Sequence, residues 1–358
     1  MNLNDPKLEP KIEGAHGARG ALFRATTRVT REMNDVAMRL ESKLVDHALP
    51  LPAAIDAEKK SLRTRAGQEV SYYVDRHGQG RPLLLVHSVN AAASSYETRP
   101  LFLAYRGKRP VYAVDLPGFG ASERDERSYT PSLFVNAIED VLRRIKSQHH
   151  DQAADVVALS LSSEFVARAA LEKSRLVHSL ALISPTGLGA QPRPASSKAG
   201  GAAADVLQRV LTTAPLGQIV FDALVSRPSV AYFLSQQFAG KVDPGLKEHA
   251  YATAHQPGAR FAPLAFLGGG LFTPDARESI YAGVEIPALV LHDDEPHTKL
   301  DGLPDLLARA PSWKAERIEG TRGLPHFEKL ETVTSALDRF WTAAEHFHPH
   351  GHNAHAHH

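Results

Sequence analysis

The sequence predicts an α/β fold with an open, mostly parallel central sheet, helices on both faces and an inserted helical subdomain. Three observations lead to this prediction. Short apolar runs typical of buried strands recur along the chain, helical patterns lie between them, and the long stretch from Pro185 to Ile286 contains no such run. Alternation of strands and helices indicates parallel strands joined by crossover helices. The interruption therefore indicates an insertion between two strands.

Composition defines the class of protein. The 358 residues are 43% hydrophobic and 23% charged, with a formal net charge of +1, which is close to the average of soluble globular proteins. Such a charge argues against a nucleic-acid partner, and the absence of cysteine excludes disulfides, thiol catalysis and cysteine-based zinc sites. The polar N-terminus lacks a secretory apolar run, and no stretch reaches the roughly 20 apolar residues that span a bilayer. We expect a cytoplasmic protein without a membrane span.

The first 75 residues are expected to form an N-terminal arm, a helix and a β-hairpin. We expect residues 1–60 to form an arm and an amphipathic helix over 27–49, because apolar residues recur there at spacings of three and four. This helix either packs on the main body or contacts a membrane surface or a partner. Residues 61–75 alternate in polarity around a turn at Ala66 and Gly67, which predicts a β-hairpin.

The buried strands follow the hairpin. Thr130 before Pro131 is a helix cap with proline at the first helical position, so a helix is expected to begin there. The predicted strands are 82–88, 111–117, 155–160, 179–185, 287–293 and, more weakly, 313–320.

These elements divide the chain into a core and an insertion. We expect residues 61–188 and 284–345 to form the two parts of the core, and 189–283 to form a helical cap. Residues 346–358 form a histidine-rich tail that we expect to be disordered. The tail is either a site of adventitious or functional metal binding or a vector-derived tag. We expect no other metal site and no cofactor.

The segment DVVALSLSSEF contains the candidate nucleophile. A buried strand ends directly at Ser160, and a helix begins within about two residues. A serine on such a sharp turn projects its hydroxyl at the carboxyl edge of the sheet, where substrates bind. Its neighbours two positions away must be small, and here they are Ala158 and Ser162. The structural alternative is a helix cap, but Ser162 and Ser163 are better placed for that role.

A serine nucleophile needs a base and an acid that orients the base. His326 lies in the loop after the last predicted strand, where the base is expected. Three consecutive carboxylates, Asp293, Asp294 and Glu295, follow the preceding strand. We favour Glu295, which directly precedes a proline, and keep Asp294 as the alternative acid.

An oxyanion hole requires two backbone N–H donors. Leu161, directly after the candidate nucleophile, is expected to supply one of them. The loop HSVNAAASSYE is expected to supply the other, from Val89 or alternatively Ser88. Ser88 and Asn90 are also candidates for substrate contacts, although Asn90 could equally shape the loop.

These residues together resemble the α/β-hydrolase fold superfamily. VHS at 86–88 matches the position of the family's His-Gly oxyanion loop, and DLPGFGAS at 115–122 resembles its structural D-x-P-G-x-G-x-S turn. ALSLSSEF around the nucleophile and GLPHFEK around the histidine resemble bacterial serine hydrolases of this superfamily, although A-L-S-L-S departs from the usual G-x-S-x-G. The resemblance covers about Ser61 to Ala344 and implies the α/β-hydrolase fold.

The leading functional hypothesis is hydrolysis of a small-molecule carboxylic ester or a related acyl compound, such as a lactone or thioester. Carbon–carbon hydrolases, cofactor-free haloperoxidases and aminopeptidases share this scaffold, and a fold does not choose among them. A non-catalytic ligand-binding member of the fold is the third hypothesis, supported by the altered glycine positions. Labelling of Ser160 by a fluorophosphonate distinguishes the enzyme hypotheses from the non-catalytic one.

Overall fold

The computed structural model describes residues 50–190 and 216–347. They form an eight-stranded sheet in the order β1-β2-β4-β3-β5-β6-β7-β8. β2 pairs antiparallel with β1 and β4, and the other neighbours are parallel. The strands are β1 (Glu58–Arg63), β2 (Glu69–Asp75), β3 (Leu83–Val86), β4 (Val111–Val114), β5 (Ala154–Leu159), β6 (Val177–Ile183), β7 (Ala288–His292) and β8 (Trp313–Arg317).

The predicted fold class is confirmed. The hairpin and the six later strands all form, and the hairpin turn contains Gly67 at φ +81°, a left-handed conformation that glycine adopts without strain. Every residue of β3, β4 and β5 is buried, which explains why these strands read as continuous apolar runs rather than as alternating ones.

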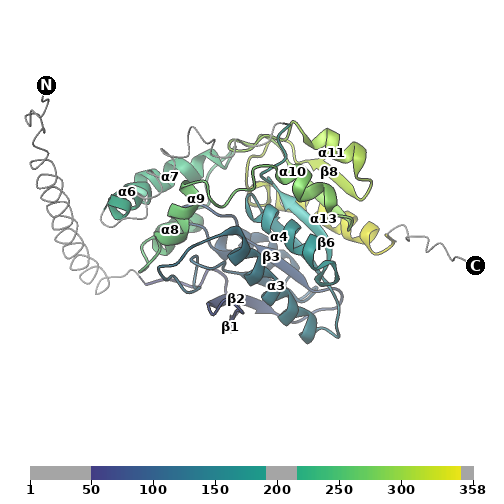
Figure 1. Ribbon diagram of the computed structural model, residues 1–358, viewed down its shortest axis with the longest axis horizontal. Coiled ribbons are helices and arrows are strands. Elements are labelled where there is room, and N and C mark those ends of the chain that lie inside the picture. Colours follow the sequence, from purple (N-terminus) through teal and green to yellow (C-terminus); the bar gives the residue numbers. More distant parts are fainter. Residues whose placement is uncertain (1–49, 191–215, 348–358) are drawn as a thin grey trace, which may run out of the picture.

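Helices cover both faces of the sheet (Figure 1). One apolar cluster packs α3, α4 and α11 against one face, and a second packs α2 and α13 against the other. The core helices are α2 (Arg99–Tyr105), α3 (Pro131–Gln148), α4 (Ser162–Glu172), α11 (Leu303–Arg309), α12 (Pro325–Glu328) and α13 (Leu330–Ala344), with single 3-10 turns at η1 (Ser95–Thr98) and η2 (Ser174–Leu176).

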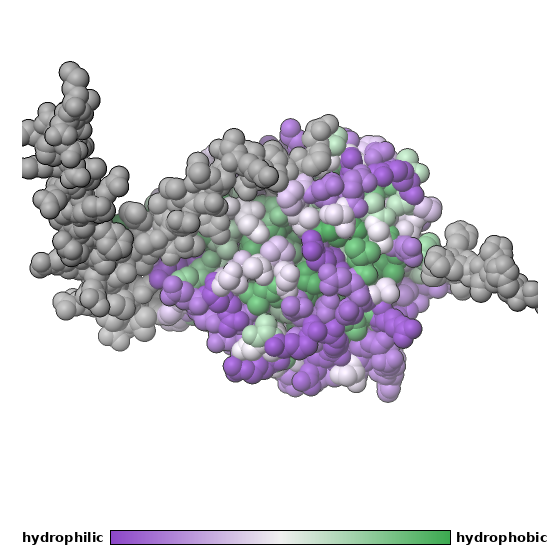
Figure 2. All heavy atoms as spheres, viewed as in Figure 1, coloured by the Kyte–Doolittle hydropathy of each residue, from purple (hydrophilic) through white to green (hydrophobic). Residues whose placement is uncertain are grey.

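Helix α3 begins where the sequence predicts. The Thr130 hydroxyl accepts the N–H of Leu133 at 3.3 Å, and Pro131 is the first helical residue. Its buried face includes Phe134, whose ring stacks on that of Phe165 in α4, with centroids 5.0 Å apart. Hydrophilic residues dominate the lower part of the molecule in Figure 2, where α3 lies. The stacking of Phe134 on Phe165 holds α4, the helix that follows the candidate nucleophile, against α3.

An insertion of helices separates β6 from β7. Its helices α6 to α9 lie together at the left in Figure 1, whereas α10 and η3 pack with the main apolar cluster of the core. Its small apolar core is built around Phe221, Val230 and Leu264, and Ala91 and Ala92 of the core domain pack against it. The domain boundaries at 188/189 and 283/284 stay a prediction. The described elements of the insertion are α6 (Leu216–Leu224), α7 (Arg227–Gln236), α8 (Pro244–Ala254), α9 (Phe261–Leu267), α10 (Ala276–Ser279) and η3 (Tyr281–Gly283).

The D-x-P-G-x-G-x-S turn has a structural role in this chain. The buried carboxylate of Asp115 accepts the N–H and the hydroxyl of Ser95, each at 2.7 Å, and the N–H of Ala121 at 2.9 Å. Gly120 has φ +53°, and a Cβ there would lie 2.0 Å from Cγ of Asp115. The turn therefore requires glycine at this position.

Several predicted segments lie outside the described residues: most of the N-terminal arm with the amphipathic helix at 27–49, residues 191–215 of the predicted cap, and nearly all of the histidine-rich tail. Within residues 50–190 and 216–347, no helix has the length and hydrophobicity needed to cross a membrane.

Candidate active site

Ser160 occupies a strained turn between β5 and α4. Its φ is +50°, a conformation that side-chain-bearing residues adopt rarely and that costs roughly 1–2 kcal/mol. Backbone hydrogen bonds hold it there: its N–H donates to the carbonyl of Ile183 at 2.9 Å, and its carbonyl accepts the N–H groups of Ser163 at 3.1 Å and Thr186 at 3.5 Å. The residue is partly exposed among buried neighbours. Such an over-determined, strained serine is typical of an activated nucleophile.

The two residues that replace the usual glycines fit by different means. Ala158 is fully buried in β5, between Val86 of β3 and Leu182 of β6. Ser162 is also fully buried, and its hydroxyl donates to the carbonyl of His87 at 2.5 Å. Ser162 does not cap α4, as the sequence had suggested, because the helix begins at Ser162 itself. Leu161 occupies the cap position, and no side chain accepts a hydrogen bond from the first turn there.

The two predicted oxyanion donors have free N–H groups. Within the described part of the chain, neither Val89 nor Leu161 donates its backbone N–H to any acceptor. By contrast, the N–H of Ser88 donates to Oε2 of Glu97 at 2.8 Å. This geometry favours Val89 over Ser88 as the donor from the loop after β3.

Asn90 is occupied in shaping this loop. Its Nδ2 donates to Oγ of Ser88 and to Oε1 of Glu97, each at 2.8 Å. Its Oδ1 accepts the N–H of Ala92 at 2.8 Å. Because both ends of the amide are hydrogen-bonded within the loop, the role of shaping the loop accounts for the Asn90 side chain without a substrate contact.

His326 lies in α12, after β8, and is completely buried. Its Nε2 is 2.7 Å from the carbonyl oxygen of Glu97, and its Nδ1 is buried without a hydrogen-bond partner. Burial lowers the pKa of His326 to about 4, although the hydrogen bond to Glu97 opposes this shift. The imidazole is therefore neutral, as a general base must be. Neither Ser160 nor Glu295 is hydrogen-bonded to it in this arrangement.

The three consecutive carboxylates have different surroundings. Asp293 accepts Nε of Arg317 at 2.5 Å and the N–H of Thr321 at 2.9 Å; burial opposes ionisation, yet these bonds hold its pKa below the ordinary value. Asp294 is exposed and lies 3.3 Å from Nε of Arg322. Glu295 points inward and has a raised pKa, because burial outweighs its hydrogen bonds.

Ser184 joins the loops that carry the candidate residues. It follows β6 with a left-handed φ of +49°. Its hydroxyl lies 2.8 Å from Oε1 of Glu295 and 3.0 Å from the carbonyl of Gly323 in the histidine loop. The preceding residue, Ile183, accepts the N–H of Ser160. The serine, acid and histidine loops thus meet at one edge of the sheet.

Two residues of this site escaped sequence reasoning. Glu97 lies within the loop predicted to form the oxyanion hole, and its position at the end of an otherwise small and uncharged stretch was the available signal. Ser184 is a polar residue at the end of an apolar strand, which is the same pattern that singled out Ser160. The contacts of Ser184 with Glu295 and Gly323 could not be predicted, because these residues are more than 100 positions away in the sequence.

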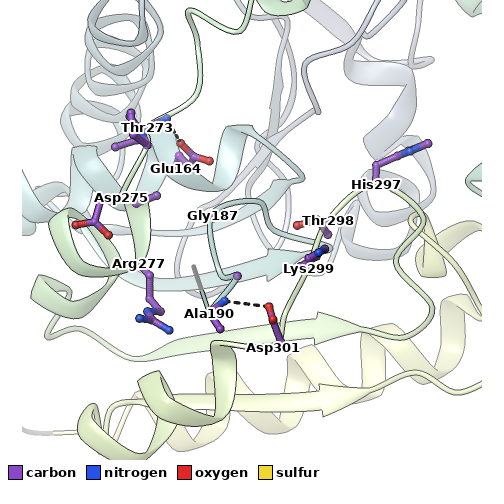
Figure 3. A pocket seen from close by; sticks show the side chains of 13 residues that line it. Glu164, Gly187, Ala190, Thr273, Asp275, Arg277, His297, Thr298, Lys299 and Asp301 are labelled. Atoms are coloured by element: carbon purple, nitrogen blue, oxygen red, sulfur yellow. Dashed lines mark hydrogen bonds between the residues drawn. The ribbon is translucent and has the colours of Figure 1, made fainter. Parts of the chain in front are cut away.

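A cavity of about 380 Å³ lies beside this edge, between the loops that follow β6 and β7 and the segment before α10 (Figure 3). Glu164, in the first turn of α4, reaches it and accepts the N–H of Thr273 at 2.8 Å. Ala190 donates its N–H to Asp301 at 2.9 Å across the lower part of the view. The candidate serine and histidine are not among its described lining residues.

Among residues 50–190 and 216–347, no three histidine, aspartate or glutamate side chains gather as metal ligands would. The arrangement suits acyl transfer: it combines a serine on a strained turn, two backbone N–H groups without acceptors in the described residues, and a buried neutral imidazole.

The strand order, with a serine turn after β5 and a histidine loop after β8, defines the class of α/β hydrolases. A family model described as the alpha/beta hydrolase family matches residues 83–337, and the chain belongs to that family. A comparison with curated proteins gives no significant match.

Solved structures of this fold are similar over most of their length. A serine hydrolase involved in carbazole degradation has 18% identity and a TM-score of 0.62, with 80% of this chain and 99% of that one covered. An enol-lactonase from Burkholderia xenovorans has 14% identity and a TM-score of 0.60, covering 79% and 100%. An esterase from Exiguobacterium antarcticum has 14% identity and a TM-score of 0.59, covering 79% and 99%. At these identities the likeness defines the fold alone.

Proposed function

We propose that this protein is a serine hydrolase that cleaves a carboxylic ester or a related acyl compound, such as a lactone or thioester. Ser160 is the nucleophile, His326 the general base and Glu295 the acid, and the N–H groups of Val89 and Leu161 form the oxyanion hole. The observation that carries the proposal is the strained Ser160, held at φ +50° beside two backbone N–H groups without acceptors. A serine that merely capped a helix would need neither feature.

The proposed reaction begins with a rotation of His326. A carbonyl can only accept, so the ring nitrogen that contacts Glu97, Nε2, carries the proton, and Nδ1 is bare. Attack requires the other tautomer, with Nδ1–H toward the acid and bare Nε2 toward the serine. A half-turn about Cβ–Cγ exchanges each ring nitrogen with a ring carbon and releases Nε2 from the carbonyl. Proton exchange then gives the reactive tautomer.

Acyl transfer then follows from the positions of these groups. The hydroxyl oxygen of Ser160 attacks the substrate carbonyl while Nε2 of His326 takes its proton. The new oxyanion accepts the N–H groups of Val89 and Leu161. The imidazolium, stabilised by the carboxylate, protonates the leaving group, and a water activated by the same histidine releases the acid from the acyl-enzyme.

Glu295 is favoured over Asp294 as the acid because of where each side chain lies. Glu295 is directed toward Ser184 and, through it, toward the histidine loop. Asp294 is 68% exposed and paired with Arg322. An exposed carboxylate stabilises a buried imidazolium poorly, because water screens the interaction.

A fluorophosphonate probe tests the proposal. We expect the folded protein to be labelled and Ser160→Ala to lose labelling, at least 1,000-fold in rate, since the probe needs the activated hydroxyl. Ser163→Ala is the matched control: its hydroxyl is buried three residues away without a hydrogen-bond partner, so labelling should persist. Absence of labelling in the wild-type protein, or equal labelling of Ser160→Ala, would contradict the proposal and favour a non-catalytic role.

A further inference from the structure

The 3-10 turn η1, four residues long, is fixed on two sides. Ser95 is bonded to the buried carboxylate of Asp115. The ring of Tyr96 stacks on that of His249 in α8, with centroids 5.0 Å apart, and its hydroxyl lies 3.4 Å from Asp243. The turn therefore links the core domain to the inserted helices, and Glu97 is the next residue within it.

The side chain of Glu97 is a buried acceptor for the oxyanion loop. The residue is 4% exposed, and its two oxygens accept the N–H of Ser88 and Nδ2 of Asn90, each at 2.8 Å. Within the described ranges, no lysine, arginine or histidine forms an ion pair with it. A carboxylate buried without a cation is stabilised by such donors alone, so its function in the structure is to hold this loop.

The main chain of the same residue contacts the candidate base. The carbonyl of Glu97 accepts Nε2 of His326 at 2.7 Å. The bond between the Ser88 N–H and the carboxylate holds the peptide that precedes the one carrying the free N–H of Val89. The carbonyl of that second peptide, on Ser88, accepts Nδ1 of His87 at 2.6 Å, so Glu97 and His87 hold the loop together. One residue thus contacts both the oxyanion loop and the histidine.

We propose that Glu97 is a positioning residue: its carboxylate aims the Val89 N–H at the reacting carbonyl, and its backbone carbonyl holds His326 in the resting orientation. This role rests on the proposed hydrolase function and adds a residue to it. Glu97 does not touch the substrate; it acts through the loop and the histidine.

The variant Glu97→Gln tests the side chain while keeping its size. An amide has one acceptor oxygen, and its NH₂ would face either the N–H of Ser88 or the NH₂ of Asn90, so one of these donors loses its partner. We expect kcat for an ester to fall about 10- to 100-fold, in line with the loss of one oriented donor. KM should change by less than about threefold, because the lost interaction belongs to the transition state.

Glu139→Gln is the matched control. Glu139 is also buried, at 2% exposure, but it lies in α3 and pairs with Arg65 and Arg143. Its replacement should leave kcat unchanged. Amide hydrogen exchange supplies a second readout that needs no activity: the peptide containing Ser88 and Val89 should exchange about 10-fold faster in Glu97→Gln and not in the control.

These readouts separate the two proposals. Unchanged exchange at Ser88 and Val89 in Glu97→Gln overturns the positioning role, whether or not the protein cleaves esters. Faster exchange with unchanged kcat also overturns it and leaves a purely structural residue. If the wild-type protein is not labelled by the fluorophosphonate, the hydrolase function fails, and exchange alone decides whether Glu97 holds the loop. Should Glu97→Gln not fold, Glu97→Asp keeps the charge but shortens the side chain by one carbon and withdraws it from the Ser88 N–H, and unchanged exchange at Ser88 and Val89 in that variant overturns the role.

Discussion

The two sides of the proposed active site, one with the candidate nucleophile and the other with the candidate acid and base, are organised differently. On the nucleophile side, Ser160 is already strained, and the N–H groups of Val89 and Leu161 are already free. On the acid–base side, His326 donates to a backbone carbonyl and Glu295 accepts from Ser184, so neither contacts the other. For the proposed reaction, the first side is preformed, whereas the second must rearrange before a proton can move from Ser160 to His326.

This difference follows from what each side has to do. Backbone donors stabilise a developing charge best when they need no reorientation during the reaction. A histidine must accept a proton, stabilise as a cation and return the proton, so it needs freedom to change partners. Changes at the candidate acid, at the residue that links the loops and at the contact with the inserted helices test this difference between the two sides.

The largest effect is expected at the acid. Glu295→Gln should lower kcat about 100- to 10,000-fold, because a neutral amide does not stabilise the imidazolium. Asp294→Asn should change kcat by less than about threefold, because that side chain is exposed and paired with Arg322. Steady-state kinetics of both variants on the same ester decide the assignment, and the reverse ranking would make Asp294 the acid.

A smaller effect is expected at Ser184, which holds Glu295 and contacts the histidine loop. Ser184→Ala should lower kcat about 3- to 30-fold and shift the acid limb of the pH–rate profile upward. Burial already raises the pKa of Glu295, and the lost hydrogen bond from Ser184 had been lowering it.

Ser179→Ala is the control for this change. Ser179 lies in the same strand, β6, and its hydroxyl donates to Asp155 at 2.6 Å, away from the candidate residues. If both variants shift the pH–rate profile equally, Ser184 has no specific link to the acid.

The smallest effect concerns stability at the contact between η1 and the inserted helices. Burial lowers the pKa of His249 to about 4, with the Asp115 carboxylate opposing this shift and the Arg124 guanidinium adding to it. The unfolded chain binds this proton near pH 6.5 and the folded protein only near pH 4. The contribution of His249 to the free energy of unfolding is therefore fully present above about pH 6.5 and is lost as the pH falls toward 4.

His249→Phe keeps an aromatic ring against Tyr96 and removes the titrating group. Between pH 7 and pH 5, the wild-type free energy of unfolding should fall by about 2 kcal/mol more than that of the variant. Urea unfolding at the two pH values measures the difference. Equal losses in the two proteins would mean that His249 accepts a proton in the folded state.

Much of this organisation could be predicted from local sequence. Buried strands such as β5 leave a continuous apolar run, and Ser160 and His326 follow strand ends, so chain order alone assigned them. The acid could not be assigned in the same way, because Asp293, Asp294 and Glu295 are adjacent and only the path of the loop decides which points inward.

The contacts of Glu97 and Ser184 also could not be predicted from the neighbouring sequence. The carbonyl of Glu97 meets His326 across 229 positions of the chain, and Ser184 meets Glu295 across 111. Such contacts arise only when the sheet brings its strand ends together. The tautomer of His326 depends on them, so it too follows from tertiary structure rather than from sequence pattern.

The left-handed backbone at Ser160 has a consequence for the stability of this chain. Glycine would adopt φ +50° without the steric cost that a side chain incurs, so a glycine at this position would relieve the turn and abolish any nucleophile. The folded protein is therefore less stable at its reactive residue than its own backbone would allow. Glycine at position 160 should therefore stabilise the fold while it removes the proposed nucleophile.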